Sequence, residues 1–454
     1  MQKVEQMKTR HSSGRVVQIL LICIMAVLTL QEGTLAQDNR VKQNQLRQGI
    51  RVLTKVNPSS DIVALRVYLP VGPRYESAEQ SGLSNLMLRL LQAGTETRTA
   101  ADIANAIDSI GAELSTDINK DYGGLVLKTT RATFDQGLDI FFDCLLHSVF
   151  PEDRLANERQ TILREIKQDR DNLLNEAFRL FQKDFYGEHP YGNPALGLEE
   201  TVSQLSREDV VQKYDWALSP SELIFVAVGN FDPDQLIQKI DKEFRARKIS
   251  RSSRKGLPIE VDNHLAVTAE NKTSIVKRQS EAENLILGYL APAINSKDFA
   301  VMRVIDSIMG GSMNSRLFTE LREKRHLAYQ VGSAYPNRLG PSFFGIYMGG
   351  SAPDKHETAV QSILAEVEKL KNEPVPADEL QRAKTFIKGT FIMSQETNMG
   401  QASLYGLHEV MGLGADYVEK FPTLIDAVTA EDIRRVAQEY FTTYTLTAIQ
   451  PEKK

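Results

Sequence analysis

The stretch that decides the fold is residues 82–95, which read GLSNLMLRLLQAGT. Its apolar side chains predict a buried helix over about residues 81–91, followed by the pair Gly94-Thr95. Upstream, residues 62–70 read IVALRVYLP, a short apolar run with β-branched side chains that predicts a strand. The first unit of the fold is therefore a strand, a loop and a buried helix.

A similar succession returns in the second half of the chain, where a helical run opens at 296–298 and extends to about Met309 after a strand. The matching pairs are the strands 62–70 and 284–290, the capped helix starts 206–211 and 429–433, and the strands 223–228 and 445–449. These pairs are offset by about 220 residues, a spacing that predicts a duplicated domain and not a solenoid of short repeats.

Composition places the chain among ordinary globular proteins. It has 454 residues, of which 42% are hydrophobic and 25% charged, and its formal net charge is −5. The charge balance has no basic excess, so nucleic acid is not expected as a partner. Long amphipathic helices, such as 357–370 and 378–390, accompany the strands, and we therefore expect two α+β domains.

The first 36 residues have the layout of a secretory signal peptide. Four basic residues precede the apolar run 16–30, and Thr34-Leu35-Ala36 ends in a small residue before a polar stretch. We predict cleavage after Ala36, a secreted or periplasmic location, and no stable membrane span afterwards. The alternative is a signal that is retained as a membrane anchor.

A basic, serine-rich segment separates the two halves. Residues 245–256 read RARKISRSSRKG and show no apolar period, which is typical of a linker; the alternative is a phosphate-binding patch. The predicted division of the chain is a signal peptide at 1–36, an N-terminal domain at 37–245, a linker at 246–257 and a C-terminal domain at 258–454.

Only one cysteine, Cys144, remains after the predicted cleavage, so the mature chain forms no internal disulfide. It lies in the apolar run 140–146, and we interpret it as a buried core thiol. The alternative is a catalytic nucleophile assisted by His147, which we place in the same apolar helix.

Residues 82–95 resemble the zinc-motif helix of the pitrilysin/insulinase peptidase family. In that family the helix carries His-x-x-Glu-His and ends in Gly-Thr, so that two histidines one helical turn apart hold zinc and the glutamate activates the metal-bound water. The three positions are here occupied by Asn85, Leu88 and Arg89. The resemblance implies a duplicated fold in which each domain is a mostly antiparallel sheet packed with helices.

The family's third ligand is a downstream glutamate, preceded seven residues earlier by another. Glu158 and Glu165 match that pair in the stretch 157–166, NERQTILREI. Asparagine is a poor zinc ligand, and arginine keeps its proton and repels a dication. We therefore expect no metal in this chain, and we expect Arg89 to take the metal's place by pairing with Glu165 through two hydrogen bonds. The alternative is that both are ordinary solvated charges.

Histidines elsewhere offer no second metal site, because no two of them lie within a helical turn of the mature sequence. His189, in 187–192, resembles a loop that the family also has, and we interpret it as structural.

The second half resembles the family more closely at 309–329, MGGSMNSRLFTELREKRHLAY. In active relatives an arginine and a tyrosine from this region help to hold the substrate backbone and the oxyanion, and Arg322 and Tyr329 match their positions. The alternative is structural, with the arginine capping a carboxylate and the tyrosine ring packed. Residues 377–384 also follow the family pattern, so the resemblance extends from about Val41 to Ile449.

The resemblance implies a non-catalytic subunit of a heterodimeric secreted zinc endopeptidase. Family members of this length work in pairs, and this chain looks like the one that supplies chamber wall, Arg322 and Tyr329, while a zinc-bearing partner supplies the metal and base for cutting peptides. Alone it is expected to be inactive.

The alternative is a peptide-binding or assembly protein with no catalytic role, in which Arg322 and Tyr329 are buried. The chain also resembles, more distantly, the core proteins of mitochondrial cytochrome c reductase, which kept the fold and are chiefly structural. An autonomous peptidase of another mechanism would need a nucleophile and base that no motif suggests.

Overall fold

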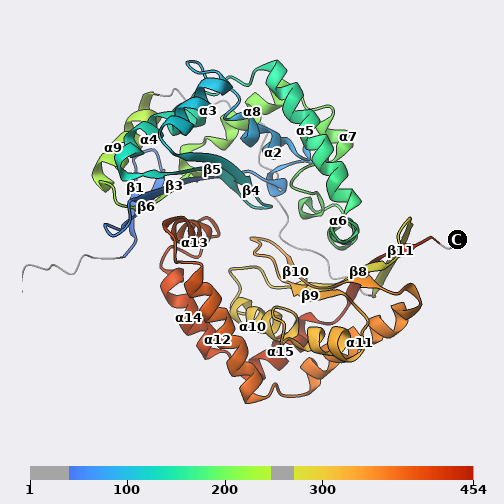
Figure 1. The fold of residues 1–454 in the computed structure, drawn as a ribbon. Coiled ribbons are helices and arrows are strands. Elements are labelled where there is room, and N and C mark those ends of the chain that lie inside the picture. Colours follow the sequence, from blue (N-terminus) through green and yellow to red (C-terminus); the bar gives the residue numbers. More distant parts are fainter. Residues whose placement is uncertain (1–39, 247–269, 453–454) are drawn as a thin grey trace, which may run out of the picture. The chain divides into compact units, whose positions relative to one another are not determined.

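The computed structural model describes residues 40–246 and 270–452, and residues from Val41 onwards form one compact unit. Its first half is built on a six-stranded sheet in the order β1-β2-β6-β3-β5-β4 (Figure 1). The strands are β1 (Lys42–Gln45), β2 (Arg51–Val56), β3 (Ile62–Leu69), β4 (Glu113–Ile118), β5 (Gly123–Thr130) and β6 (Ile224–Gly229). Only β2 and β6 pair in parallel; the other neighbours are antiparallel.

The second half repeats this arrangement with five strands in the order β7-β11-β8-β10-β9. They are β7 (Lys272–Arg278), β8 (Glu283–Ala291), β9 (Gln330–Ala334), β10 (Ser342–Ser351) and β11 (Tyr444–Pro451). The single parallel pair is again at one side, between β7 and β11, so this sheet matches β2-β6-β3-β5-β4 strand for strand. The predicted α+β class, the mostly antiparallel sheets and the duplication are confirmed.

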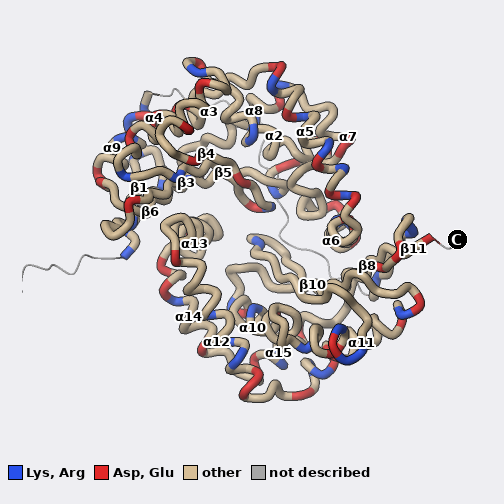
Figure 2. Tube along the Cα trace, in the orientation of Figure 1, with Lys and Arg blue, Asp and Glu red and all other residues tan. Residues whose placement is uncertain are grey.

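Helices complete both halves. Those of the first half are α2 (Leu83–Leu90), α3 (Ala100–Ser109), α4 (Phe134–Leu146), α5 (Glu152–Asp171), α6 (Leu173–Tyr186), α7 (Glu199–Val202), α8 (Arg207–Ala217) and α9 (Pro233–Ala246). Those of the second half are α10 (Phe299–Met309), α11 (His356–Asn372), α12 (Ala377–Met393), α13 (Asn398–Val410), α14 (Tyr417–Ala427) and α15 (Ala430–Tyr440), with a π-helical element, η7 (Phe318–Lys324). Figure 2 shows acidic and basic residues interspersed along these helices. No helix among those described is both long and apolar enough to cross a membrane.

The duplication extends to how two equivalent helices begin. At α8 the side chain of Ser206 accepts from the Asp209 backbone N–H, and the Asp209 carboxylate accepts from the Ser206 backbone N–H. Thr429 and Asp432 form the same capping box at α15. Both helix starts are therefore as predicted, because the capping side chains satisfy backbone donors that a helix leaves without partners.

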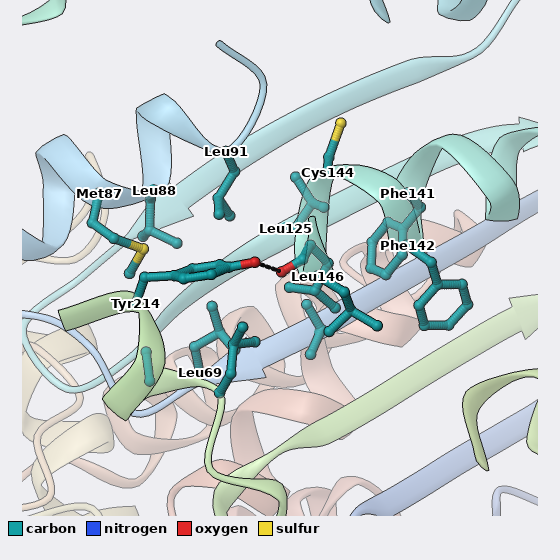
Figure 3. Packing of buried hydrophobic residues seen from close by; sticks show 14 of the residues in the cluster. Leu69, Met87, Leu88, Leu91, Leu125, Phe141, Phe142, Cys144, Leu146 and Tyr214 are labelled. Carbon is teal, nitrogen blue, oxygen red and sulfur yellow. Dashed lines mark hydrogen bonds between the residues drawn. The ribbon is translucent and has the colours of Figure 1, made fainter. Parts of the chain in front are cut away.

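The core of the first half lies between one face of its sheet and the helices that cover it (Figure 3). Tyr214 of α8 reaches into it and donates from its hydroxyl to the Leu145 carbonyl over 3.0 Å. Cys144 is fully buried, and burial raises the pKa of its thiol to about 12, so it is the core thiol that the sequence predicts. The sequence analysis placed His147 in the same helix as Cys144, and this is wrong. Helix α4 ends at Leu146, and His147 occupies the C-cap position with a partly exposed ring.

Each half places one helix on the sheet of the other. Helix α13 packs against β3 and β6, where Gly406 lies so close to Tyr68 that a Cβ atom would be 2.1 Å from the tyrosine ring. Helix α6 packs against β8 and β11, where Gly288 faces Phe181 in the same way. Glycine is required at these two contacts because any larger residue would overlap an aromatic ring.

The predicted domain limits stay predictions. Helix α9 runs to Ala246, one residue beyond the predicted end of the N-terminal domain. The remaining linker, 247–257, and the predicted signal peptide, 1–36, lie outside the described residues.

Candidate functional site

Helix α2, which carries the altered motif, is anchored at its N-terminus by hydrogen bonds. The buried Glu76 carboxylate accepts from the backbone N–H groups of Gly82 and Ser84 over 2.9 and 2.6 Å, so a negative charge lies at the positive end of the helix. Gly82 has φ +95°, and a Cβ atom there would lie 2.8 Å from Gly197. The sequence analysis did not identify Glu76, since the glutamate lies outside the helix that it caps.

Arg89 and Glu165 form the ion pair that the sequence predicts. Arg89 Nη1 donates to Glu165 Oε1 over 2.9 Å, and Nη2 donates to Oε2 over 2.5 Å. Arg89 Nε donates to Asn85 Oδ1 over 3.2 Å. Glu158, two turns before Glu165 on α5, approaches Nη1 to 4.0 Å. Arg89 thus connects α2 with α5 through residues that all stand at positions of the zinc motif. The alternative, in which Arg89 and Glu165 are separate solvated charges, is wrong.

Leu88 stands at the position of the catalytic glutamate and lies in the hydrophobic core, with about 1% of its surface exposed. Figure 3 shows it on α2 with Met87 and Leu91. An apolar side chain packed in this way has no group that could take a proton from water.

The donor set at this site does not fit zinc. Zinc needs neutral imidazoles, thiolates or carboxylates, whereas Asn85 and Arg89 offer an amide oxygen and a permanent cation. Both oxygens of Glu165 already accept from the guanidinium. Among residues 40–246 and 270–452, no group of three His, Cys, Asp or Glu side chains is arranged to hold a metal.

Arg322 and Tyr329 form a second group on the surface of the other half. Arg322 is in η7 and Tyr329 precedes β9; the Arg322 Cζ atom lies 5.5 Å from the Tyr329 ring centroid and 4.9 Å from that of Phe318. Tyr329 is 72% exposed and Arg322 is also exposed. No ion pair of Arg322 is found within the described part of the chain. The two side chains are therefore not the buried structural groups that the alternative requires.

Phe318 is a member of this group that the sequence analysis missed. It precedes Arg322 by four residues, a spacing that brings side chains together on one helical face and that could have identified it. The element is anchored by Leu317 and Leu321, both fully buried, and by Arg316, whose guanidinium donates to both Glu379 oxygens over 2.8 and 2.7 Å. Turns of π-helix are frequent at functional sites.

His189 is structural, as interpreted. Its Nδ1 accepts from the Tyr191 backbone N–H over 3.1 Å. The buried Tyr191 hydroxyl donates to Asp121 and accepts from Arg74 and from the Gly340 backbone N–H, so this loop ties the two halves together. Among the described residues, no hydrogen bond or ion pair joins the Arg89 group to the Arg322–Tyr329 group.

Comparison with known proteins gives the same assignment for both halves. Residues 51–199 match the model of the insulinase family (peptidase family M16), and residues 204–387 match that of the peptidase M16 inactive domain. An uncharacterized zinc protease of Rickettsia felis is 30% identical over 409 residues, which cover 89% of this chain and 96% of that protein. An uncharacterized zinc protease of Bacillus subtilis is 27% identical over 90% of this chain and 98% of its own length.

Solved structures show the same fold. A protease from Helicobacter pylori superimposes with a TM-score of 0.84 at 23% identity, covering 91% of this chain and all of that one. A peptidase M16 inactive domain from Pseudomonas fluorescens gives a TM-score of 0.81 at 20% identity, over 91% and 98% of the two chains. On its sequence, its duplicated sheets and the extent of these matches, the chain belongs to the insulinase family of peptidases, family M16.

Proposed function

We propose that this chain is a non-catalytic subunit of a heterodimeric, secreted zinc endopeptidase. The observation that carries the proposal is the pair Arg89–Glu165, because a guanidinium bound to both carboxylate oxygens leaves no place for a dication. The buried Leu88 removes the general base as well. A partner of the same family would supply zinc, its ligands and the base.

The contribution of this chain would come from Arg322 and Tyr329. Both side chains are exposed, and the Arg322 guanidinium lies against the rings of Phe318 and Tyr329. Within the described residues, its N–H donors form no ion pair with a carboxylate. Such donors suit a peptide carbonyl or the oxyanion that develops on it, provided that a partner brings its zinc site to this surface. The sheets and helices around them would form part of a chamber wall for peptide substrates.

The exposure of these residues supports the catalytic-complex proposal over an assembly protein without catalysis. The match to the M16 inactive domain covers Arg322 and Tyr329 and not the altered zinc motif, so it does not by itself assign activity. Export is part of the proposal, and N-terminal sequencing of the secreted form should begin at Gln37.

The test is reconstitution with the zinc-bearing M16 chain from the same host. We expect peptide cleavage by the mixture to exceed that of the partner alone and to fall roughly 10²-fold with Arg322→Ala, the usual effect of removing one oxyanion donor. Arg325→Ala is the matched control, because this nearby arginine is exposed and bound to Glu320. Equal cleavage by the partner alone, by the wild-type mixture and by the Arg322→Ala mixture would refute the proposal.

A further inference from the structure

The Arg322 side chain is held by aromatic rings and not by polar groups. Its Cζ atom lies over the Phe318 ring, 4.9 Å from the ring centroid, and 5.5 Å from the centroid of the Tyr329 ring. Within the described residues, its guanidinium forms no hydrogen bond or ion pair. Contact with a ring uses none of the N–H donors of an arginine, so all of them stay available to a substrate.

Of the two rings, Phe318 is the one that the core anchors. It is partly buried and packs against the core of the second half, and the neighbouring Leu317 and Leu321 are fully buried. Tyr329, by contrast, is 72% exposed. An exposed arginine has many rotamers, and substrate binding must offset the loss of that freedom. A ring anchored in the core restricts the guanidinium of Arg322 before a substrate arrives.

Tyr329 is placed by an irregularity in strand β10. Its backbone N–H donates to the Gly349 carbonyl over 3.1 Å, and the pairing of β10 with β8 shifts register between Gly349 and Ser351. Gly350, which this bulge leaves without a partner in β8, has φ +79°, a conformation that favours glycine. A Cβ atom at Gly350 would lie 3.0 Å from the Tyr329 Cβ atom. Bulges are frequent beside active sites, where they redirect a side chain.

We propose that Phe318 and Gly350 are positioning residues, which orient Arg322 and Tyr329 for the substrate of the zinc-bearing complex. Phe318 restricts the guanidinium, and the bulge at Gly350 determines where the Tyr329 side chain leaves the sheet. Neither residue touches the substrate, since both act through the pair that does. The inference rests on the proposed function and adds which parts of this chain set the geometry of the pair. Changes at 318 and 350 therefore alter cleavage only while Arg322 and Tyr329 are present.

The first test is a double-mutant cycle in the complex reconstituted with the zinc-bearing chain. Phe318→Leu should lower kcat/KM roughly two- to fivefold, the effect of losing an exposed cation–π contact, and Phe318→Tyr should retain activity because it keeps the ring. In the Arg322→Ala background, Phe318→Leu should have no further effect. Phe391→Leu is the matched control, because that ring packs against the same core but contacts Phe421. Its kcat/KM should equal that of the wild type.

The second test adds a Cβ atom at the bulge. Gly350→Ala should lower kcat/KM roughly tenfold or more by displacing Tyr329, and it should have no further effect in the Tyr329→Phe background. Gly412→Ala is the matched control, since Gly412 has φ +74° and a Cβ atom there would meet nothing within 4 Å. Both variants carry the strain of a left-handed alanine, and thermal unfolding compares their stabilities. Only Gly350→Ala should change cleavage.

A measurement on this chain alone separates a failure of this inference from a failure of the proposed function. The NMR resonance of the Arg322 Nε–H group, identified by its absence in Arg322→Ala, should be shifted by ring currents. Phe318→Leu should move it, and Phe391→Leu should not. A resonance that Phe318→Leu leaves in place would overturn the role of Phe318, as would an equal loss of kcat/KM in the wild-type and Arg322→Ala backgrounds.

The remaining outcomes are equally decisive. Equal cleavage by Gly350→Ala and Gly412→Ala would overturn the role of the bulge. If Arg322→Ala and Tyr329→Phe themselves leave cleavage unchanged, the proposed function fails and the positioning roles fail with it. Loss of cleavage in those two variants, without any effect of Phe318→Leu or Gly350→Ala, would leave the proposed function intact and overturn only this inference.

Discussion

At the scale of single residues, Asn85, Leu88 and Arg89 determine what the site can bind. The sequence alone predicted the pair Arg89–Glu165, because arginine has a fixed charge and a geometry that matches a carboxylate. The bond from Arg89 to Asn85 and the approach of Glu158 were not predictable, since they depend on how α2 crosses α5. Phe318 was missed because its role comes from the position of Arg322 and not from its own chemistry.

Restoring the two ligand positions should restore metal binding. In Asn85→His/Arg89→His, two imidazoles one helical turn apart would join Glu165, which no longer has a guanidinium partner, and we expect about one zinc ion per chain. Metal analysis after equilibrium dialysis measures it. Either single histidine variant should hold less zinc, and Asn85→Ala/Arg89→Ala should hold none. Stoichiometric zinc in the wild type at this site would contradict the interpretation of Arg89 as the metal's replacement.

The same double variant should remain inactive as a peptidase, because Leu88 supplies no general base. Adding Leu88→Glu puts a carboxylate into a position that is now hydrophobic core, so some loss of stability should accompany any gain of activity.

At the scale of elements, periodicity and capping predicted most of the strands and helices that the sequence analysis named. The capping boxes of α8 and α15 are local, so the sequence carries the complete signal. Strand β1 has no such signal: its residues KQNQ are all exposed, and it is a strand only because its backbone pairs with β2. The parallel pairing of β2 with β6 likewise depends on chain topology and not on local pattern.

Helix α13 carries a histidine that should make stability depend on pH. His408 is buried against the Tyr417 ring, and burial lowers the pKa of its imidazole from 6.5 to about 4. In the unfolded chain His408 therefore takes up a proton below about pH 6.5, whereas in the folded chain it does so only near pH 4. Stability from the neutral imidazole is present above pH 6.5 and is lost as pH falls from 6.5 to 4, by about 3 kcal/mol at most.

Urea unfolding of wild type and His408→Phe between pH 7 and 4 measures this effect. The variant should lose less stability over that range than the wild type, although carboxylates titrate in both. His147→Phe is the control for replacing a histidine by phenylalanine, because that ring is partly exposed. Parallel profiles for wild type and His408→Phe would show that the buried imidazole is not the cause.

At the scale of the whole molecule, the duplication was predictable from matching segments about 220 residues apart, whereas the exchange of helices between the halves was not. Helix α6 belongs to the first half but packs on the second sheet, and α13 does the reverse. No local sequence pattern in α6 or α13 indicates which of the two sheets the helix packs on. Only the contacts explain why glycine stands at 288 and 406, where a neighbouring aromatic ring leaves no room for a Cβ atom.

The contact between Gly406 and Tyr68 gives the sharpest test of this arrangement. Gly406→Val would force α13 away from β3, because its Cβ would lie 2.1 Å from the Tyr68 ring, and overpacking of this kind lowers the unfolding free energy by about 1–3 kcal/mol. Chemical denaturation measures it, with Gly389→Val as the control in open space. Tyr68→Leu removes the ring and a hydrogen bond from its hydroxyl to the Ser403 carbonyl, so it is destabilising alone. Combined with Gly406→Val, it should restore part of the loss, since the overlap then disappears. Strict additivity of the two effects would mean that α13 does not rest on the first sheet through this pair.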